Sequence, residues 1–303
     1  MSKAHDRLDG KQKTLAVGVL QVRYWQHLVN ENLKKNGFPV PVHVAFGHEA
    51  VAVALCAAMQ PPDSLILSHR NIEYNLARAG ALQPVWDEYM RLPTGAGAGR
   101  LGSMNLTNPE RGILYTSSIL GNNFGVACGV ALGYQLANKP GVVTVLTGDG
   151  AMEEGTFYES LVLARSLGLK CQFVVENNNH ALASTIEQRR CPIDIEHLCN
   201  AVEVPYLKLS GNSVFDYAAK LDGLRETIVG SSAPACVEVD LTTMNRHAGA
   251  TPGWSADPMN VDLQRGLIIR EDDSDPVYVL KQELAPACYA EIEQLATAQK
   301  GSA

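Results

Sequence analysis

One stretch of the sequence decides the fold class: Val142-Val-Thr-Val-Leu-Thr-Gly-Asp-Gly150, continued after an intervening segment by Cys171-Gln-Phe-Val-Val-Glu-Asn-Asn178. Both pieces begin with a continuous apolar run, which is typical of a strand buried on both faces of a parallel sheet. The segment between them, 156–167, carries apolar residues at helical spacing, with Phe157 and Leu161 one turn apart. A strand, a helix and a strand within about 35 residues predict a parallel βαβ unit.

Further segments extend this unit in both directions along the chain. Ala235–Asp240 is predicted to be another buried strand, and Leu65–Leu67 a short one. Apolar periodicity predicts helices over 12–35, 49–59, 72–79 and 121–137, and a charged helical stretch follows Asp262. We therefore expect an α/β fold with a doubly wound, mostly parallel sheet. We expect residues 1–303 to form a single domain with N-terminal and C-terminal helical extensions.

Composition and charge argue against several classes of function. The 303 residues include 25 Lys+Arg and 32 Asp+Glu, giving a net charge of −7, so the basic excess typical of nucleic-acid-binding proteins is absent. No window offers the roughly 18 apolar residues of a membrane span, and the first residues lack the apolar core of a secretory signal. Seven cysteines without a Cys-x-x-Cys pair favour buried thiols over disulfides or zinc ligands. We expect a cytoplasmic protein that binds neither nucleic acid nor membranes.

A glycine-rich segment, Gly97-Ala-Gly99-Arg-Leu-Gly102, matches the Gly-x-Gly-x-x-Gly pattern of dinucleotide-binding folds. That pattern requires a strand before it and the N-terminus of a helix within it. Here a helix-like stretch, 86–91, precedes the glycines, and no helical pattern follows them. We interpret the segment as a mobile or substrate-proximal loop and not as a nicotinamide site.

Two polar motifs follow the strands of the βαβ unit, namely Gly148-Asp-Gly150 and Glu176-Asn-Asn-Asn-His180. Parallel strands end at the same edge of a sheet, and α/β folds bind their ligands at that edge. The carboxylate of Asp149 and the amide oxygens of the asparagines suit Mg²⁺, and Gly150 allows a phosphate to approach the following helix. Either motif alone is more typical of a turn. Together, at the ends of both strands, they predict a magnesium and phosphate site.

The stretch from Gly148-Asp-Gly150 to Glu176-Asn-Asn178 resembles the thiamine-diphosphate signature, which opens with Gly-Asp-Gly and closes with Asn-Asn. It is most similar to the α chain of the decarboxylating component of 2-oxo acid dehydrogenase complexes, of the pyruvate and acetoin dehydrogenase type. Three flanking segments resemble the same family: His43-Val-Ala-Phe-Gly-His-Glu-Ala50, Ser68-His-Arg70 and Gly99-Arg-Leu-Gly-Ser-Met104. The resemblance implies the thiamine-diphosphate-binding fold, in its diphosphate-binding half.

The resemblance also implies a role for individual residues. Asp149 and Asn178 would bind Mg²⁺ through their side chains, and His180 would do so through its backbone carbonyl. Arg70 would bind the diphosphate with its fork of donors, and His69, in the place of a family tyrosine, would add one donor. The other implied cofactor contacts are Gly150 and Ala151 at the diphosphate, and Ser118 and Leu120 at the aminopyrimidine and the bend of the cofactor.

The chemistry implied by the resemblance is decarboxylation of a small 2-oxo acid, with the cofactor as electron sink. His43 and His247 would face the reacting end as catalytic residues. Activation of the cofactor needs a glutamate at the pyrimidine ring, which in this two-chain family comes from the β chain, while Glu49 aligns with a structural helix start. We therefore expect a chain that is incomplete alone and pairs with a β chain carrying the pyrimidine-binding domain, in an α2β2 heterotetramer.

The sequence departs from the family where the acyl group meets its acceptor. A family histidine is Ile72 here, another is Asn105, and a loop that reads His-Gly-His-Ser in the family is Asn245-Arg-His-Ala248. Three hypotheses follow. The chain is an α subunit that passes an acyl unit to a lipoyl acyltransferase, or half of a split transketolase-like or carboligating enzyme, or a non-catalytic scaffold that regulates a partner. The Asp149 and Asn178 pair argues against the scaffold, because a scaffold needs no metal ligands.

Overall fold

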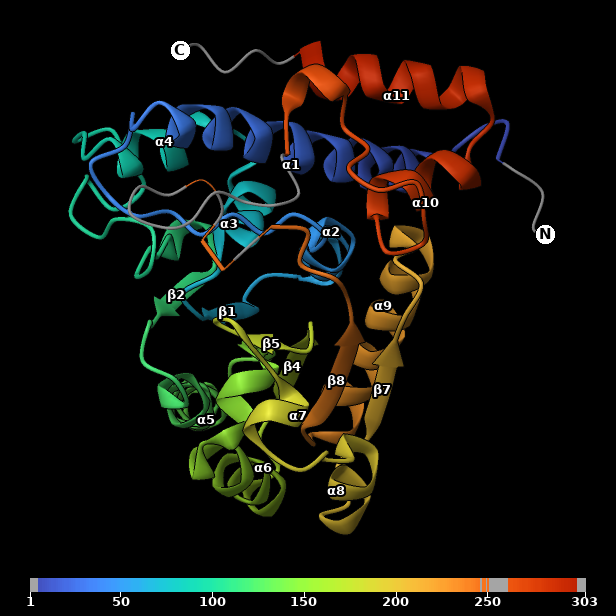
Figure 1. The fold of residues 1–303 in the computed structure, drawn as a ribbon. Helices are drawn as coiled ribbons and strands as arrows, with labels where there is room; N and C mark the ends of the chain where they lie inside the picture. The colour runs from blue at the N-terminus through green and yellow to red at the C-terminus, as the bar shows by residue number, and fades with distance from the viewer. Residues whose placement is uncertain (1–4, 246, 249, 251–260, 299–303) are drawn as a thin grey trace.

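A six-stranded, entirely parallel sheet lies at the centre of the computed structural model, which describes residues 5–245, 247–248, 250 and 261–298 (Figure 1). The strand order is β2-β1-β3-β4-β8-β7. Its strands are β1 (Ser64–Leu67), β2 (Ile113–Thr116), β3 (Val143–Gly148), β4 (Cys171–Asn177), β7 (Tyr206–Leu209) and β8 (Ala235–Asp240). A small antiparallel pair, β5 (His180–Ala181) and β6 (Ser184–Thr185), accompanies it. The predicted parallel βαβ unit is confirmed as β3, α6 (Gly155–Leu167) and β4.

Alternate residues of the central strands face two separate hydrophobic cores. Val143 and Val145 of β3 pack on one face with Phe124 of α5 (Asn122–Leu136) and Phe157 of α6. Leu146 lies in the core of the opposite face. Successive side chains of a strand point to opposite faces, so a strand covered on both sides must be apolar throughout. This coverage confirms the doubly wound architecture.

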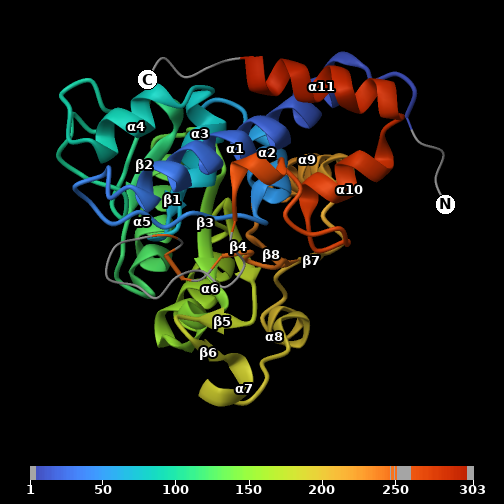
Figure 2. The same ribbon diagram turned by 45° about the horizontal axis from the view of Figure 1, so that its top comes forward.

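The helices of the second face form two layers (Figures 1 and 2). Next to the sheet lie α2 (Glu49–Ala58), α3 (Ile72–Ala79) and α9 (Val214–Ser231), and α2 packs on α9. Over them runs α1 (Gly10–Lys34), which packs against α11 (Pro286–Ala298) from the other end of the chain. The remaining helices are α4 (Gln83–Tyr89), α7 (Ile186–Arg189), α8 (Ile195–Ala201) and α10 (Pro276–Glu283). No helix of the described ranges has both the length and the hydropathy to cross a membrane.

A buried ion cluster joins the outer helical layer to α2. The Arg23 guanidinium lies 2.6 Å from Glu49 and 3.0 Å from Asp275, and all three side chains are fully buried. A second Glu49 oxygen accepts the backbone N–H of Gly47 at 2.9 Å. Burying a charge is tolerated only when it is paired and hydrogen-bonded, as it is here. Glu49 therefore has a structural task at the start of α2.

The order of the strands creates a switch point between β1 and β3. The chain passes from β1 to β2 at the sheet edge and then returns to β3 on the other side of β1. The segments that follow β1 and β3 consequently leave in opposite directions and open a crevice at their carboxyl ends. Sequence patterns missed β2 and β7, which are four-residue strands at the two sheet edges and are only partly buried.

Candidate active site

A cavity of about 340 Å³ opens at the switch point, beyond the carboxyl ends of β1, β2, β3 and β4. Of the residues predicted for the site, all but one line this cavity: His43, His69, Arg70, Ser118, Leu120, Gly150, Ala151, Asn178, His180 and His247. The exception, Asp149, is 1% exposed at the end of β3. A second cavity of about 1280 Å³ shares Arg70 and His247 with the first. The sheet thus brings the predicted residues to one place.

The predicted metal ligands have suitable oxygen atoms, although some of these atoms have protein partners. Asp149 Oδ1 is buried and has no hydrogen-bond partner among the described residues. Asn178 Oδ1 accepts the backbone N–H of His180 at 2.9 Å, while its Nδ2 donates to Thr243 Oγ1 at 2.7 Å. The His180 side chain is exposed, and its Nδ1 lies 3.1 Å from the Asn178 carbonyl oxygen. A buried carboxylate oxygen without a donor is an atom suited to a cation.

An arginine that sequence reasoning missed lies against the predicted metal site. Arg189 Nη2 donates to Asp149 Oδ2 at 2.5 Å, and Arg189 also forms an ion pair with Glu153. Arg189 ends α7, and only the fold brings this helix next to the end of β3. Its guanidinium supplies positive charge to the carboxylate that is predicted to hold Mg²⁺. No local pattern marks this arginine, because its partner lies 40 residues earlier.

Gly150 sits where the chain allows no side chain. A Cβ at this position would lie 2.7 Å from the Cβ of Ala181 in β5, closer than real Cβ atoms approach. At Gly148 a Cβ would have nothing within 4 Å. Glycine at 150 therefore permits the 3-10 turn η2 (Asp149–Glu153) to pass close to the β5–β6 hairpin. This close approach forms one wall of the cavity.

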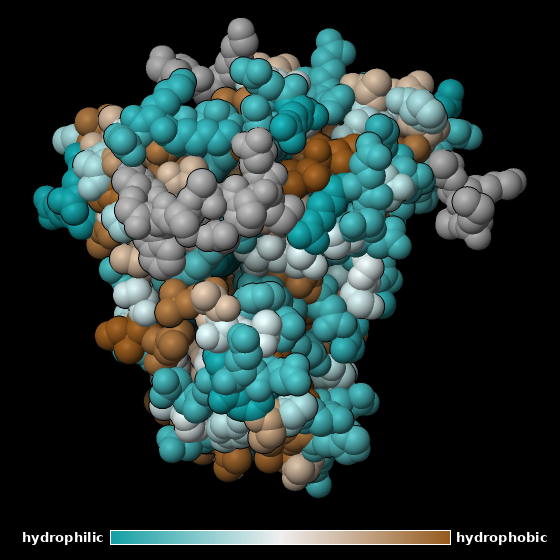
Figure 3. Space-filling view, viewed as in Figure 1, coloured by the Kyte–Doolittle hydropathy of each residue, from teal (hydrophilic) through white to brown (hydrophobic). Residues whose placement is uncertain are grey.

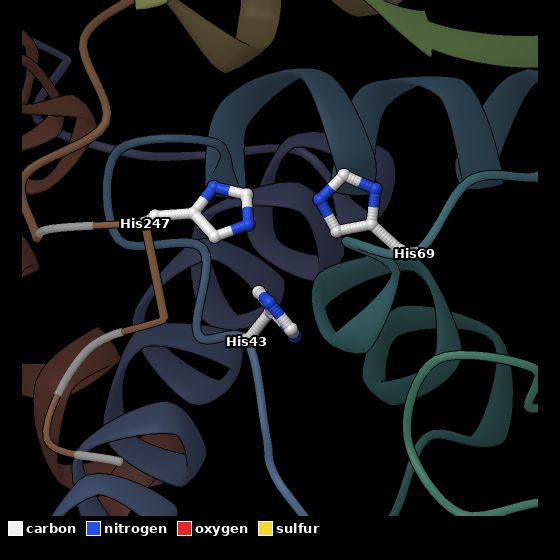
Figure 4. A group of neighbouring side chains, drawn as sticks. All are labelled: His43, His69 and His247. Atoms are coloured by element: carbon white, nitrogen blue, oxygen red, sulfur yellow. The ribbon is translucent and has the colours of Figure 1, made fainter. Parts of the chain in front are cut away.

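Three imidazoles meet in the wall of the first cavity, and one of them, His247, also lines the second (Figure 4). The ring centroids of His43 and His247 lie 4.9 Å apart, those of His43 and His69 5.1 Å, and those of His69 and His247 5.3 Å. Burial, followed by the charge of Arg70, lowers the pKa of His43 to about 2 and that of His69 to about 3. The same two causes lower the pKa of His247 to about 4. All three rings are therefore neutral at pH 7.

Arg70 is buried beneath these histidines. Its Nη2 donates to the carbonyl oxygen of His247 at 2.8 Å, and its Nη1 donates to that of Val44. The cation thus ties the segment that follows β8 to the one that precedes α2. Because Arg70 also lines both cavities, its remaining donor capacity is available to an anionic ligand.

A buried acidic cluster, which escaped the sequence analysis, forms part of the cavity wall through His48 and Glu176. His48 Nδ1 lies 3.3 Å from Glu176 Oε1 and 4.0 Å from Glu73 Oε1, and Tyr74 donates to Glu176 at 2.7 Å. Burial, and then the charge of Glu176, raise the pKa of Glu73 well above its ordinary value. Glu73 therefore favours its neutral form more strongly than an exposed glutamate does. The available sequence signal was His48 itself, which stands where the resembling family has glutamine.

The glycine-rich segment 97–102 surrounds an internal anion. The Glu88 carboxylate accepts the backbone N–H groups of Gly97 at 2.7 Å, Gly99 at 2.9 Å, Leu101 at 2.8 Å and Gly102 at 3.1 Å. A nest of backbone amides binds an anion, and here the protein supplies its own. The loop therefore has no free nest for a dinucleotide phosphate.

The sheet order and the switch-point cavity define an α/β protein with the thiamine-diphosphate-binding fold. A solved transketolase mutant from Pichia stipitis superposes with a TM-score of 0.54 over 95% of this chain and 45% of its own, at 14% identity, so this likeness concerns the fold alone. The sequence defines the family more narrowly. Residues 22–248 match the model of the dehydrogenase E1 component, and the chain belongs to this family.

Two relatives illustrate the family. The α subunit of acetoin:2,6-dichlorophenolindophenol oxidoreductase from Bacillus subtilis is 30% identical over 220 residues, which is 73% of this chain and 66% of the relative. The pyruvate dehydrogenase E1 α subunit of Zymomonas mobilis is 25% identical over 252 residues, or 83% of this chain and 70% of the relative. For the Arabidopsis thaliana mitochondrial α-1 subunit of pyruvate dehydrogenase E1, at 26% identity, the match spans 70% of this chain and 54% of the relative. The matches thus span about half to seven tenths of these relatives' lengths.

Proposed function

We propose that this chain is the α subunit of a two-chain, thiamine-diphosphate- and Mg²⁺-dependent enzyme that decarboxylates a 2-oxo acid and transfers the resulting acyl unit. One observation carries the proposal: the buried, unpartnered Asp149 Oδ1 lies beside a switch-point cavity lined by the other predicted cofactor contacts. Family membership supports the same activity. The proposal takes residues 1–303 as one domain, the diphosphate-binding half.

The residues of the cavity fit this cofactor. Asp149 and Asn178 would hold the metal through side-chain oxygens, and the carbonyl of His180 would complete the protein's share. The amide groups at Gly150 and Ala151, with Arg70, face the place of an anionic diphosphate. Ser118 and Leu120 also line the cavity.

The bound cofactor would supply the electron sink for the carbanion left by decarboxylation. Residues of the chain itself would orient the substrate and exclude water from the cavity. His43 is 7% exposed at the cavity wall, and its neutral ring offers both an N–H donor and a lone pair to a reacting oxygen. His247, on the segment after β8, faces it across the opening. A neutral imidazole can donate or accept a proton without adding charge to a site that already contains Arg70.

The mouth of the cavity indicates a partner chain. Ile119, Leu120 and Leu182 line the cavity, yet they are 67%, 52% and 64% exposed. Figure 3 shows apolar surface beside the N-terminal end of α5. Clustered exposed apolar side chains mark interaction sites. We propose that a β chain carrying the pyrimidine-binding domain covers them, in an α2β2 assembly.

Calorimetry of the co-expressed pair tests cofactor binding. We expect Asp149→Asn to lose thiamine-diphosphate binding at Mg²⁺ concentrations that saturate the wild type, whereas Asp194→Asn, on an exposed helix cap, binds normally. Equal affinity in Asp149→Asn and the wild type would refute the metal assignment. The need for a partner is tested separately: a single purified chain that turns over a 2-oxo acid contradicts it.

One structural observation bears on the alternative function, that of a carboligase. Ile72, which stands in place of a family histidine, is 1% exposed and belongs to the core beneath the site. Neither Ile72 nor Asn105 supplies an imidazole for an acceptor at the mouth. Product analysis with a panel of 2-oxo acids and ketoses, offering lipoyl, dye and aldehyde acceptors separately, distinguishes the two. Transfer to a lipoyl acyltransferase supports the first function, and carbon–carbon bond formation with an aldehyde supports a split transketolase-like enzyme.

A further inference from the structure

We propose that His43, His69 and His247 form a binding site for a divalent transition metal of the Zn²⁺ type, separate from the Mg²⁺ site at Asp149. The three rings come from three distant segments and bring one nitrogen each to within 4.8 Å of the others. Figure 4 shows a nitrogen of His69 and one of His247 turned toward each other, with His43 between and below them. The proposal does not require thiamine diphosphate.

The ligand set suits this class of metal. Imidazole is a preferred ligand of Zn²⁺, Co²⁺, Ni²⁺ and Cu²⁺, whereas Mg²⁺ prefers oxygen. Three histidines with a fourth position left open form one of the known catalytic zinc sites. With Zn–N bonds of about 2.0–2.1 Å, tetrahedral ligands lie about 3.3 Å apart, so the rings need to close by at most about 1.5 Å. Small side-chain rotations achieve this.

The state of the imidazoles also favours a metal. The His43 side chain is only 7% exposed, and its Nδ1 has no hydrogen-bond partner among the described residues. A buried ring nitrogen without a partner, on a residue that lines a cavity, indicates a missing ligand.

Charge in the neighbourhood does not prevent binding. Arg70 is the nearest cation, and its charge opposes a second positive ion at the histidines. The Glu176 carboxylate acts on Arg70 and partly offsets this charge. The open coordination position faces the cavity, where a carboxylate or ketone oxygen of a substrate would be the fourth ligand. A metal bound there would polarise that oxygen in place of the ring nitrogens of His43 and His247, whose lone pairs it occupies, and this last step rests on the proposed function.

Cobalt titration of the tag-free full-length chain, after chelator treatment, tests the site. We expect one Co²⁺ per chain, visible d–d absorption of a four- or five-coordinate ion, and no displacement by excess Mg²⁺. His69→Tyr and His247→Asn should weaken Co²⁺ binding by about 100-fold or more, since removing even an outer-shell partner reduces affinity 10–100-fold. His180→Asn, which changes an exposed histidine at the same cavity, should bind as the wild type does.

Thermal melts without metal verify that each variant is folded. Because two different ligands are substituted in separate variants, the test still works if one variant misfolds. Absence of stoichiometric Co²⁺, or wild-type affinity in both ligand variants, overturns the proposal. Because thiamine diphosphate is omitted, neither result depends on the proposed decarboxylase function. Calorimetry of Asp149→Asn reports on that function independently.

Discussion

Arg189 Nη2 donates to Asp149 Oδ2 at 2.5 Å, although the two residues are 40 positions apart. A protein cation thus holds the carboxylate that we assign to Mg²⁺, and metal binding must proceed in competition with it or share the carboxylate. We predict that Arg189→Gln lowers the Mg²⁺ concentration that half-saturates thiamine-diphosphate binding by about tenfold, which corresponds to about 1.4 kcal/mol. Calorimetry of the co-expressed pair measures it. Arg190→Gln is the control, since the ion pair of this neighbouring arginine is with Glu153, at 3.3 Å. A higher Mg²⁺ requirement in Arg189→Gln would show that Arg189 assists the metal instead.

Glu73 is expected to make stability depend on pH. Its folded-state pKa is raised by burial and by the charge of Glu176, so its stabilising contribution is complete below its ordinary pKa and is lost as pH rises. Glu73→Gln mimics the protonated form. We predict that the variant gains stability over the wild type between pH 5 and pH 8, by at most about 1.4 kcal/mol per pH unit. Urea unfolding at pH 5 and at pH 8 measures this difference in stability, and the variant Glu110→Gln, at an exposed residue, is the control. A constant difference between variant and wild type would contradict the raised pKa of Glu73.

The Glu88 carboxylate organises the glycine-rich loop. Glu88→Gln keeps the shape of the side chain but replaces one acceptor oxygen with a donor, which leaves buried backbone N–H groups unpaired. We predict a loss of about 2–3 kcal/mol in unfolding free energy, the usual effect of removing charged hydrogen bonds. Hydrogen exchange should accelerate at the amides of Gly97, Gly99, Leu101 and Gly102. Unchanged protection at these amides would mean that the loop holds its conformation by other contacts.

Glu49 should behave as a structural residue. Its replacement by glutamine leaves the fully buried Arg23 with Asp275 as its remaining carboxylate partner. We predict that Glu49→Gln destabilises the chain by about 3–5 kcal/mol, as the breaking of buried ion pairs does. Glu291→Gln, which breaks an exposed pair with Lys13, should change stability by about 0–1 kcal/mol. Denaturant melts compare the two. A Glu49→Gln variant of wild-type stability with abolished activity would instead favour a catalytic glutamate.

The buried His27 is expected to make the folded chain less stable in acid. Burial, and then the charge of Arg23, lower its pKa to about 3, so its ring is neutral in the folded chain. A group with a depressed folded pKa stabilises above its unfolded pKa, near 6.5, and this contribution is lost as pH falls toward 3. His27→Leu should flatten the decline in stability by up to about 1.4 kcal/mol per pH unit in that window. Unfolding curves from pH 7 to pH 4 provide the measurement. Parallel declines in both proteins would contradict the assignment.

Local sequence patterns were sufficient for four of the six strands of the sheet and for the location of the site. The apolar runs of β3 and β4 required burial on both faces, and helical spacing between them required a parallel crossover. Because parallel strands end together, Asp149 and Asn178 had to lie at one edge. Patterns of this kind act over neighbouring residues, where the period of the backbone fixes which side chains share a face. The short edge strands β2 and β7 carry too few residues for a period to be recognised.

The partners of the charged groups were decided only by the tertiary structure. Arg189 reaches Asp149, Arg23 reaches Asp275, and His69 meets His247, in each case across long stretches of chain whose sequences carry no sign of the pairing. Electrostatic and hydrogen-bond energies depend on distance in space and on burial, and neither quantity is a property of a local sequence. The sequence alone determined the fold class and the edge of the sheet that holds the site. The packing of distant segments determined which groups are charged, which are neutral and which are left for a ligand to satisfy.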